Sequence, residues 1–209
     1  DSGKTTTKPI NTNGNYNMNL WTGIGFKLKK IDTRFNFGPN FSLNRAADVL
    51  NSQTNYTRNY NLGFNVWASK SKEKKYDFNL GDNFTYSNSK ASLSNTVNRY
   101  IVNSFEFSAT VYLLKSLSIN SDYEFYSQQK TSRVPGVNLH FWNARVQKTF
   151  RNDEFTFYIL VRDILNQNVG LNRNFDRYTF TETRNDRLKR YGMIGFTWNF
   201  KNAGAKAKK

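Results

Sequence analysis

Three carboxylates come closest to a catalytic pattern in this chain: Glu106, Asp122 and Glu124. Asp122 and Glu124 are two positions apart, so in a strand both side chains would lie on one face, where paired carboxyls can do general acid and base work. Neither a nucleophile nor a histidine falls near them in the pattern. We therefore interpret them, with Arg34, as water-facing structural ladders or contacts to another domain, and we predict that the chain is not an enzyme.

Composition limits metal and thiol chemistry. The chain has no cysteine and one histidine, so it cannot form disulfides, thiolates or a His cluster for zinc. That histidine, His140, precedes Trp142 near the end of a predicted strand, where a place in an aromatic belt is favoured over a metal ligand without partners. We predict no metal site and no cofactor.

A basic and aromatic stretch between residues 166 and 189 is the candidate for ligand contact. Arginine and aromatic side chains suit anionic or sugar ligands through charge-assisted hydrogen bonds and stacking. The candidate residues are Arg173, Phe175, Arg177, Tyr178, Arg184 and Arg187. The alternative is a solvated hairpin around residues 178–182, in which the arginines pair with Asp176, Glu182 and Asp186.

The formal net charge of +16 raises the hypothesis of nucleic-acid binding, since clustered Lys and Arg release counterions from phosphate. The short connections between predicted strands and the C-terminal tail hold 12 basic and 4 acidic residues, at 29–32, 70–75, 115, 151–154 and 201–209. A nucleic-acid footprint would form one stripe with interleaved aromatics, whereas basic residues beside a membrane extend toward headgroups. We predict no nucleic-acid partner.

Alternation with a period of two residues runs through most of the chain and decides the fold class. From Asn15 to Leu28, apolar side chains such as Tyr16, Leu20 and Phe26 occupy the even positions, and mostly Asn, Gly and Lys occupy the odd ones; from Ile31 to Leu43 the apolar residues take the odd positions. The pattern predicts an all-β protein of about nine antiparallel strands. Their expected ranges are 15–28, 31–43, 56–66, 76–86, 101–113, 117–125, 142–150, 155–163 and 194–200.

Strand length favours a membrane protein. Several strands need about ten to fourteen residues, roughly twice the usual length in soluble sheets, whereas a tilted strand that crosses a bilayer takes roughly 9–11. The fold class predicted is therefore a transmembrane β-barrel with its apolar face in lipid. The lipid-facing positions include Phe26, Phe37, Phe64, Phe107 and Phe196. Asp82 falls in the same phase, so either a β-bulge at Gly81 turns it inward or the predicted register is locally wrong.

Connection lengths alternate along the chain. Short connections near 29–30, 69–75, 115–116 and 151–154 alternate with longer ones near 44–55, 87–99, 127–138 and 164–189. Outer-membrane barrels have short periplasmic turns and longer extracellular loops. In a nine-stranded meander the first and last strands run in the same direction, so they cannot pair in the antiparallel manner that closes such barrels.

This count predicts an incomplete barrel. Residues 1–200 are expected to be the C-terminal portion of a larger barrel, completed by strands from the same polypeptide or another chain. Residues 201–209 would be a basic periplasmic tail, and the polar residues 1–14 would lie outside the cell. The N-terminus has no apolar segment of the signal-peptide type, so we expect either a mature form or a fragment.

The most distinctive motifs lie near the C-terminus. Residues 158–168 read YILVRDILNQN and residues 190–200 read RYGMIGFTWNF. Both are similar to the last two strands of TonB-dependent outer-membrane receptors, whose Asn- and aromatic-rich relatives the rest of the chain resembles in style. The resemblance implies a barrel that imports a scarce nutrient with energy passed from the inner membrane. It also implies a plug domain, a short N-terminal box and an energy-transducing partner, of which neither plug nor box is visible in the sequence.

The last strand resembles the signal that the barrel-assembly machinery reads, in which the family has a polar residue, a glycine and two late aromatics. Gly195, Trp198 and Phe200 match this membrane-insertion signal. Met193 stands where the family has the polar residue, and nine residues follow Phe200. An amphipathic strand with an aromatic belt explains the same positions.

Three functions remain as hypotheses. The first is an outer-membrane transport receptor of which this chain supplies the C-terminal strands. The second is a small standalone outer-membrane barrel that acts as a passive pore or structural anchor. The third is a basic soluble all-β binding protein. The first two place the chain in the bacterial outer membrane, with membrane lipid as a partner.

Overall fold

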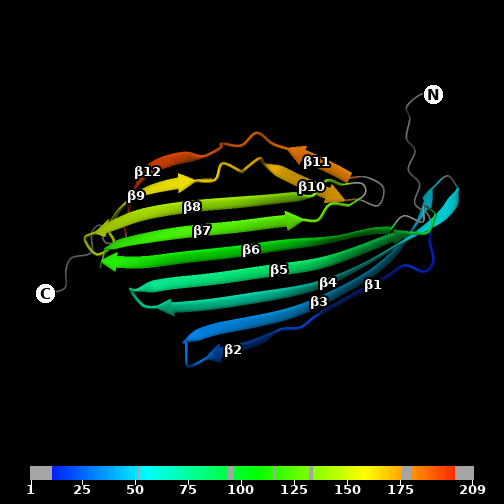
Figure 1. Ribbon diagram of the computed structural model, residues 1–209, viewed down its shortest axis with the longest axis horizontal. Coiled ribbons are helices and arrows are strands. Elements are labelled where there is room, and N and C mark those ends of the chain that lie inside the picture. The colour runs from blue at the N-terminus through cyan, green and yellow to red at the C-terminus, as the bar shows by residue number, and fades with distance from the viewer. Residues whose placement is uncertain are drawn as a thin grey trace.

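The computed structural model describes residues 11–50, 52–93, 97–114, 116–131, 134–175 and 180–200. The regular elements within these residues are twelve β-strands (Figure 1). They are β1 (Tyr16–Trp21), β2 (Ile24–Leu28), β3 (Thr33–Leu50), β4 (Gln53–Lys72), β5 (Tyr76–Ala91), β6 (Val97–Leu114), β7 (Leu117–Gln128), β8 (Val137–Phe150), β9 (Phe155–Arg162), β10 (Leu171–Phe175), β11 (Phe180–Arg184) and β12 (Tyr191–Trp198). The predicted all-β class is confirmed.

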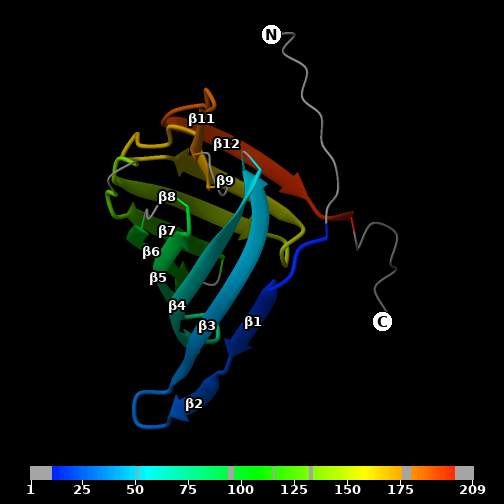
Figure 2. The same ribbon diagram turned by 90° about the vertical axis from the view of Figure 1, so that its right-hand side faces the viewer.

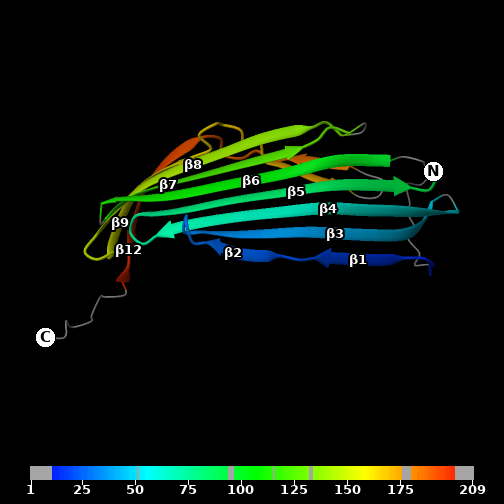
Figure 3. The same ribbon diagram turned by 60° about the horizontal axis from the view of Figure 1, so that its bottom comes forward.

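Ten strands form one antiparallel sheet in the order β1, β3, β4, β5, β6, β7, β8, β9, β12, with β2 beside β3 as well. Each of the long strands pairs with its neighbours in sequence, so the sheet is a simple meander, as Figure 3 shows. The antiparallel arrangement is confirmed. The sheet curls into an arc that stays open between β1 and β12 (Figure 2). Among the described residues, no pairing joins these two edges.

The two edge strands run in the same direction. β1 starts at Tyr16, opposite Arg45 near the far end of β3, and β12 starts at Tyr191, opposite Arg162. Both strands therefore begin at the end of the sheet with the longer connections, here called the loop end. They finish at the other end, here called the turn end. The sequence predicted that the first and last strands run in the same direction, and the sheet has this arrangement.

The first predicted strand is divided in two. β1 and β2 keep one continuous register against β3, since Trp21 lies opposite Asn40 and Ile24 opposite Phe37. Between them, Thr22 N donates to Pro39 O over 3.2 Å, but proline has no N–H with which to return a ladder bond. The break at Thr22 therefore follows from Pro39 on the neighbouring strand.

Two long loops expected from the sequence are mostly strand. β3 and β4 pair as far as Leu50 and Gln53, and β5 and β6 pair as far as Lys90 and Val97. The prediction of loops at 44–55 and 87–99 was therefore wrong. The residues there are polar and look like loops in the sequence, but most of them pair across β3 and β4 or across β5 and β6 and extend these hairpins. The longest connection contains an extra hairpin, in which β10 pairs with β11. The count of nine strands was wrong by this hairpin and by the division of the first strand.

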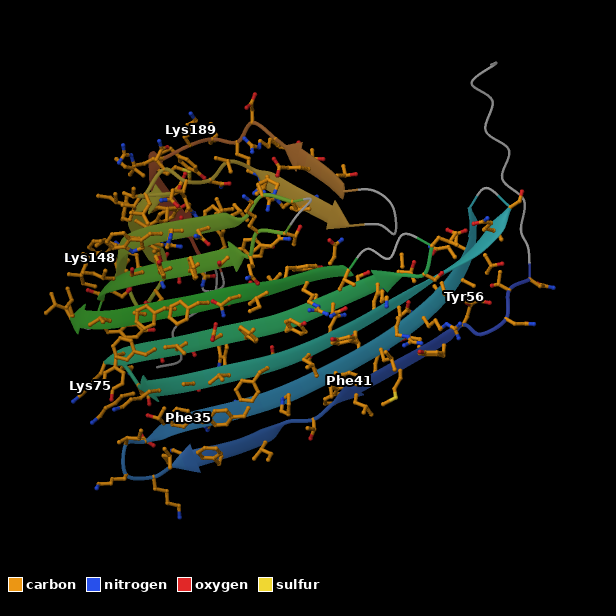
Figure 4. All side chains as sticks on the ribbon, turned by 45° about the vertical axis from the view of Figure 1, so that its right-hand side comes forward. Phe35, Phe41, Tyr56, Lys75, Lys148 and Lys189 are labelled. Carbon is orange, nitrogen blue, oxygen red and sulfur yellow. The ribbon has the colours of Figure 1, made fainter. Side chains whose placement is uncertain are left out.

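Side chains divide between two faces of the large sheet. The face called outer carries registered rows such as Phe37, Val66 and Phe105. The face called inner carries residues such as Asn36 and Glu106, and the segment after β9 covers part of it. Figure 4 shows Phe35, Phe41 and Tyr56 following the outer side of β3 and β4, with Lys75 and Lys148 at the turn end.

The apolar side chains do not form a core. Among the described residues, the buried hydrophobic residues are Ala47 and Val134. Large apolar side chains on the outer face are exposed instead, as at Leu62, Ile159 and Ile194, the last with 85% of its surface accessible. Exposed apolar patches of this extent mark a surface that another apolar medium or partner covers.

The five predicted lipid-facing phenylalanines all lie on the outer face. Several form a ring ladder across the strands: Phe26 lies 5.7 Å from Phe35 and from Phe37, and Phe37 lies 6.2 Å from Phe64. Phe107 lies opposite Leu80, and Phe196 lies opposite Phe157. Their shared face agrees with the alternation read from the sequence.

Asp82 also lies on this outer face. β5 pairs without a shift on both sides of Gly81, which lies opposite Trp67 on β4 and Glu106 on β6. Neither a bulge at Gly81 nor a local register error accounts for Asp82, so both proposed explanations were wrong. The structure keeps this carboxylate between Val66 and Phe105.

Candidate functional site

The segment after β9 begins with a turn that Asp163 holds in place. Asp163 has φ +50° and is 4% exposed, and its carboxylate accepts hydrogen bonds from Gln167 N at 2.9 Å and Asn168 N at 3.0 Å. Its own N–H donates to Asn143 Oδ1 on β8 over 3.0 Å. Aspartate tolerates the left-handed region better than most residues and caps its own turn, which explains its place here.

Two further bonds tie this turn to β8. Ile164 N donates to Trp142 O over 2.8 Å, and His140 N donates to Gln167 Oε1 over 2.9 Å. The motif at residues 158–168 therefore anchors the long connection to β8. The sequence singled out this motif but not the role of Asp163 as its cap.

The hairpin of β10 and β11 is held against the sheet by Arg173. Its guanidinium forms an ion pair with Glu182 at 2.8 Å and donates to Gln128 Oε1 at 3.2 Å and to Pro135 O at 3.0 Å. Its side chain is 7% exposed. Arg173 hence ties the hairpin to the end of β7 and the connection that follows.

Glu182 joins two of the predicted ligand arginines. It accepts a hydrogen bond from Arg184 Nε at 2.9 Å as well as those from Arg173. The bonds from Arg173 are the main reason that the pKa of the Glu182 carboxyl is lowered from its ordinary value. Both arginines thus pair with an acidic residue of the hairpin, as in the alternative interpretation of this segment.

The other predicted ligand residues divide as follows. Arg187 lines the cleft described below. Arg177, Tyr178 and Asp176 lie outside the described residues, as does the side chain of Phe175. The basic tail at 201–209 and residues 1–10 also lie outside them.

A cleft of about 410 Å³ lies between this segment and the inner face of β6, β7 and β8. Glu106 and Glu124 lie directly opposite each other on β6 and β7 and line it from the sheet. Arg173 and Arg187 line it from the covering segment, and Phe141 adds an aromatic wall. A second hollow, which shares Glu124 and Arg187, continues toward Tyr191.

The cleft offers both signs of charge beside an aromatic surface. Like charges directly opposite on neighbouring strands repel, so the Glu106 and Glu124 pair favours a cation or hydrogen-bond donor between them. Arg187 supplies a guanidinium that can bind a carboxylate, phosphate or sugar hydroxyl. Such a lining suits a polar ligand of small or moderate size with both donors and acceptors.

The remaining predicted carboxylate, Asp122, is engaged within the sheet. It accepts hydrogen bonds from Ser108 Oγ at 2.7 Å and Asn120 Nδ2 at 3.4 Å. This is a structural ladder of the kind expected. Arg34 lies apart from Asp122, on β3, where its register partners on the neighbouring strands are Lys27 and Ser69.

His140 lies on the outer face, where Tyr123 Oη is 2.7 Å from its Nδ1 and the Phe125 ring is 4.7 Å from its ring. It therefore belongs to an aromatic cluster near the loop end. Within the described part of the chain, no three His, Cys, Asp or Glu residues come together as a metal site would require.

The residues of the predicted insertion signal lie on β12, the strand at one edge of the sheet, or directly after it. Gly195 faces inward beneath Tyr158, whose ring a Cβ at position 195 would overlap. Arg145 lies over the same tyrosine ring at 4.0 Å. The Trp198 ring packs in a tilted arrangement against Phe155, at 5.7 Å between ring centroids, and against Phe200, at 4.3 Å; Phe200 is 62% exposed.

Comparison of the chain with protein families, curated proteins and solved structures finds no match. Within the described residues, no helix is long and apolar enough to cross a membrane.

Proposed function

We propose that this chain supplies the C-terminal strands of an outer-membrane transport receptor. The observation that carries the proposal is the outer face of β4. Between Arg58 and Lys70, every outer-facing side chain of this strand is uncharged: Tyr60, Leu62, Phe64, Val66 and Ala68. The intervening positions carry polar or small residues or Trp67 and face inward.

The length of this uncharged band fits a bilayer. Arg58 and Lys70 are twelve residues apart on β4. That separation is about 40 Å along a strand, and a strand tilted by about 40° rises about 30 Å over it, which is the thickness of the hydrocarbon core. Basic and aromatic residues at both limits are typical of membrane interfaces, where Lys and Arg extend toward headgroups.

The open edges support the incomplete-barrel part of the proposal. Unpaired strand amides in hydrocarbon cost several kcal/mol each, so membrane sheets close. In this proposal, β1 and β12 pair with further strands from the same polypeptide or from another chain. The plug and the energy-transducing partner of such receptors would accompany those strands.

The cleft on the inner face supports the receptor role. It lies toward the loop end, where a ligand from outside would arrive, and the segment anchored by Asp163 and Arg173 covers it. The ligand would be a polar molecule that Arg187 and the Glu106 and Glu124 pair can bind together. The polar inner face also fits a passive pore, which is the second candidate.

The membrane assignment is tested with single cysteines, because the chain has none of its own. Phe64→Cys should react with lipid-soluble probes and resist water-soluble maleimides in intact membranes, whereas the adjacent Asn65→Cys should show the opposite. Protection of Phe64→Cys in purified protein without detergent would mean that a second protein layer covers the outer face, and the proposal would fail.

Receptor and pore are separated by conductance. A receptor barrel closed by a plug should give no steady current in a planar bilayer bathed in KCl. Stable open steps with the complete protein would transfer the assignment to the passive pore.

A further inference from the structure

A row of four cations crosses the outer face near the loop end. Arg45 on β3, Arg58 on β4 and Lys90 on β5 lie directly opposite one another in register. Arg99 on β6 lies one step closer to the centre, opposite Asn88. These four residues are here called the basic row.

The basic row has no acidic partner on the sheet. In the part of the chain that the structure describes, no ion pair joins any of the four to a carboxylate. The acidic residues of the described central strands, such as Asp77, Glu106 and Asp122, face inward, apart from Asp82. Asp82 lies eight positions from Lys90 along β5, nearer the middle of the strand.

Such a row costs free energy unless an anion neutralises it. Like charges directly opposite on neighbouring strands destabilise a sheet. Aromatic rings relieve this only in part: Arg45 lies 4.1 Å from the Tyr56 ring centroid. Arg58, Lys90 and Arg99 are exposed, so their charges are available to a ligand on the outer side.

The surroundings indicate what kind of anion fits. Two residues closer to the middle of β3 and β4 than Arg45 and Arg58, Leu43 and Tyr60 begin the apolar band of the outer face. A ligand there would carry its negative charge at one end and apolar chains along the sheet, which is the architecture of an anionic lipid. Repeated guanidinium groups favour phosphate, to which arginine donates paired hydrogen bonds.

We propose that the basic row binds the phosphate groups of an anionic lipid headgroup in the outer leaflet. This inference rests on the membrane placement in the proposed function and adds a specific ligand to it.

The basic residues at the turn end are arranged differently from the basic row. Lys70 and Lys148 are not registered partners, and each lies over an aromatic ring, Tyr76 at 5.9 Å and Phe150 at 5.3 Å.

The test compares two variants of the full protein with equal loss of charge. The first replaces Arg45, Arg58, Lys90 and Arg99 with Gln, and the control replaces Lys70, Lys72, Lys148 and Arg151 with Gln. Each is reconstituted in nanodiscs of phosphatidylcholine with a small fraction of lipid A, a diphosphorylated glycolipid. Retained lipid A is measured by native mass spectrometry.

The wild type and the control variant should retain similar amounts of lipid A, and the basic-row variant should retain about tenfold less, which is about 1.4 kcal/mol of binding free energy. Equal retention by both variants would overturn the proposal, as would equal loss. Release of the lipid by millimolar inorganic phosphate would also overturn it, since the row would then be a site for free phosphate.

Flotation with lipid vesicles separates this outcome from failure of the proposed function. Protein that never floats with vesicles would contradict the membrane placement itself. Protein that floats normally but shows no preference for lipid A would remove the basic-row proposal alone.

Discussion

The side-chain amide of Asn103 donates a hydrogen bond to Asp82 Oδ1 over 2.6 Å, diagonally across β5 and β6 on the outer face. Asp82 itself lies opposite Phe105, and Asn103 lies opposite Phe84. The carboxylate thus has one strong donor in apolar surroundings. In water this pair would stabilise the sheet slightly, whereas in lipid an ionised Asp82 would still be costly.

Replacing Asp82 with Asn should therefore stabilise the protein in a bilayer by up to about 2 kcal/mol. The new asparagine side chain carries no charge, and its amide oxygen can still accept the hydrogen bond from Asn103. Asp77→Asn is the control, since Asp77 lies on the inner side of the same strand and accepts from Tyr112 Oη at 3.1 Å. Urea unfolding in lipid vesicles measures both. A lower midpoint for Asp82→Asn than for wild type would count against lipid around Asp82.

The middle of β4 gives the sharpest contrast between neighbouring positions. Phe64→Arg places a charge at the centre of the apolar band and should destabilise the folded protein in a bilayer by about 2–4 kcal/mol. Asn65→Arg points to the polar inner face and should cost much less. The same unfolding measurement in vesicles compares the two. Similar losses for both would show that the faces do not differ in solvent.

The end of β12 should matter for assembly beyond its apolar area. Trp198→Ala with Phe200→Ala should lower insertion into the membrane more than Phe35→Ala with Phe41→Ala does, because the assembly machinery is expected to read the last strand. The measurement is the heat-modifiable fraction in membranes after a short pulse of synthesis. Equal losses would mean that the ending acts only as another amphipathic strand.

Gly195 should be intolerant of a side chain. Gly195→Ala would push its methyl group into the Tyr158 ring, and overpacking of this kind costs about 1–3 kcal/mol. Gly192→Ala on the same strand is the control, since a Cβ at position 192 would meet only Leu160 O, at the ordinary contact distance of 3.9 Å. In a Tyr158→Ala background the cost at position 195 should fall. Persistence of the full cost there would assign it to the backbone of β12.

The hairpin over the cleft should loosen at acidic pH. Because its folded pKa is lowered, Glu182 stabilises the docked hairpin above the ordinary glutamate pKa of 4.5, and this contribution is lost as the pH falls through the folded value. Hydrogen exchange in β10 and β11 should therefore rise between neutral pH and pH values below about 4 after correction for the intrinsic rate.

Arg173→Ala should give the same loosening at neutral pH, since it removes the bonds to Glu182, Gln128 and Pro135. Arg184→Ala should have little effect, because the Arg184 side chain is 71% exposed and such pairs contribute little. Equal exchange in both variants would mean that Arg173 does not hold the hairpin.

The alternation of residue types by itself determined which face each strand residue occupies. Phe26 and Phe64 on one face and Asn36 and Asn120 on the other follow from a period of two, a property of the extended backbone that needs no knowledge of neighbours. The shared direction of the first and last strands followed from the odd number of alternating segments. The division of the first strand and the extra hairpin leave it unchanged, because β1 and β2 are collinear against β3 and the hairpin lies outside the large sheet.

Pairing between strands was decided only by the tertiary structure. A slip of one strand by two residues would keep every side chain on its face but change its partners, so alternation cannot show that Glu106 lies opposite Glu124 or that Arg45, Arg58 and Lys90 form a row. Turn geometry and packing across the whole sheet set that register.

The same limit applies to features that depend on a distant residue. Pro39 interrupts the strand beside it, and polar residues at 44–55 continue a ladder because a partner strand is there to pair with them. Arg173 looked like a ligand residue in the sequence, yet its place is set by Gln128 and Glu182, which are 45 and 9 positions away. Long-range hydrogen bonds of this kind are decided only when the chain has folded, because no local periodicity encodes them.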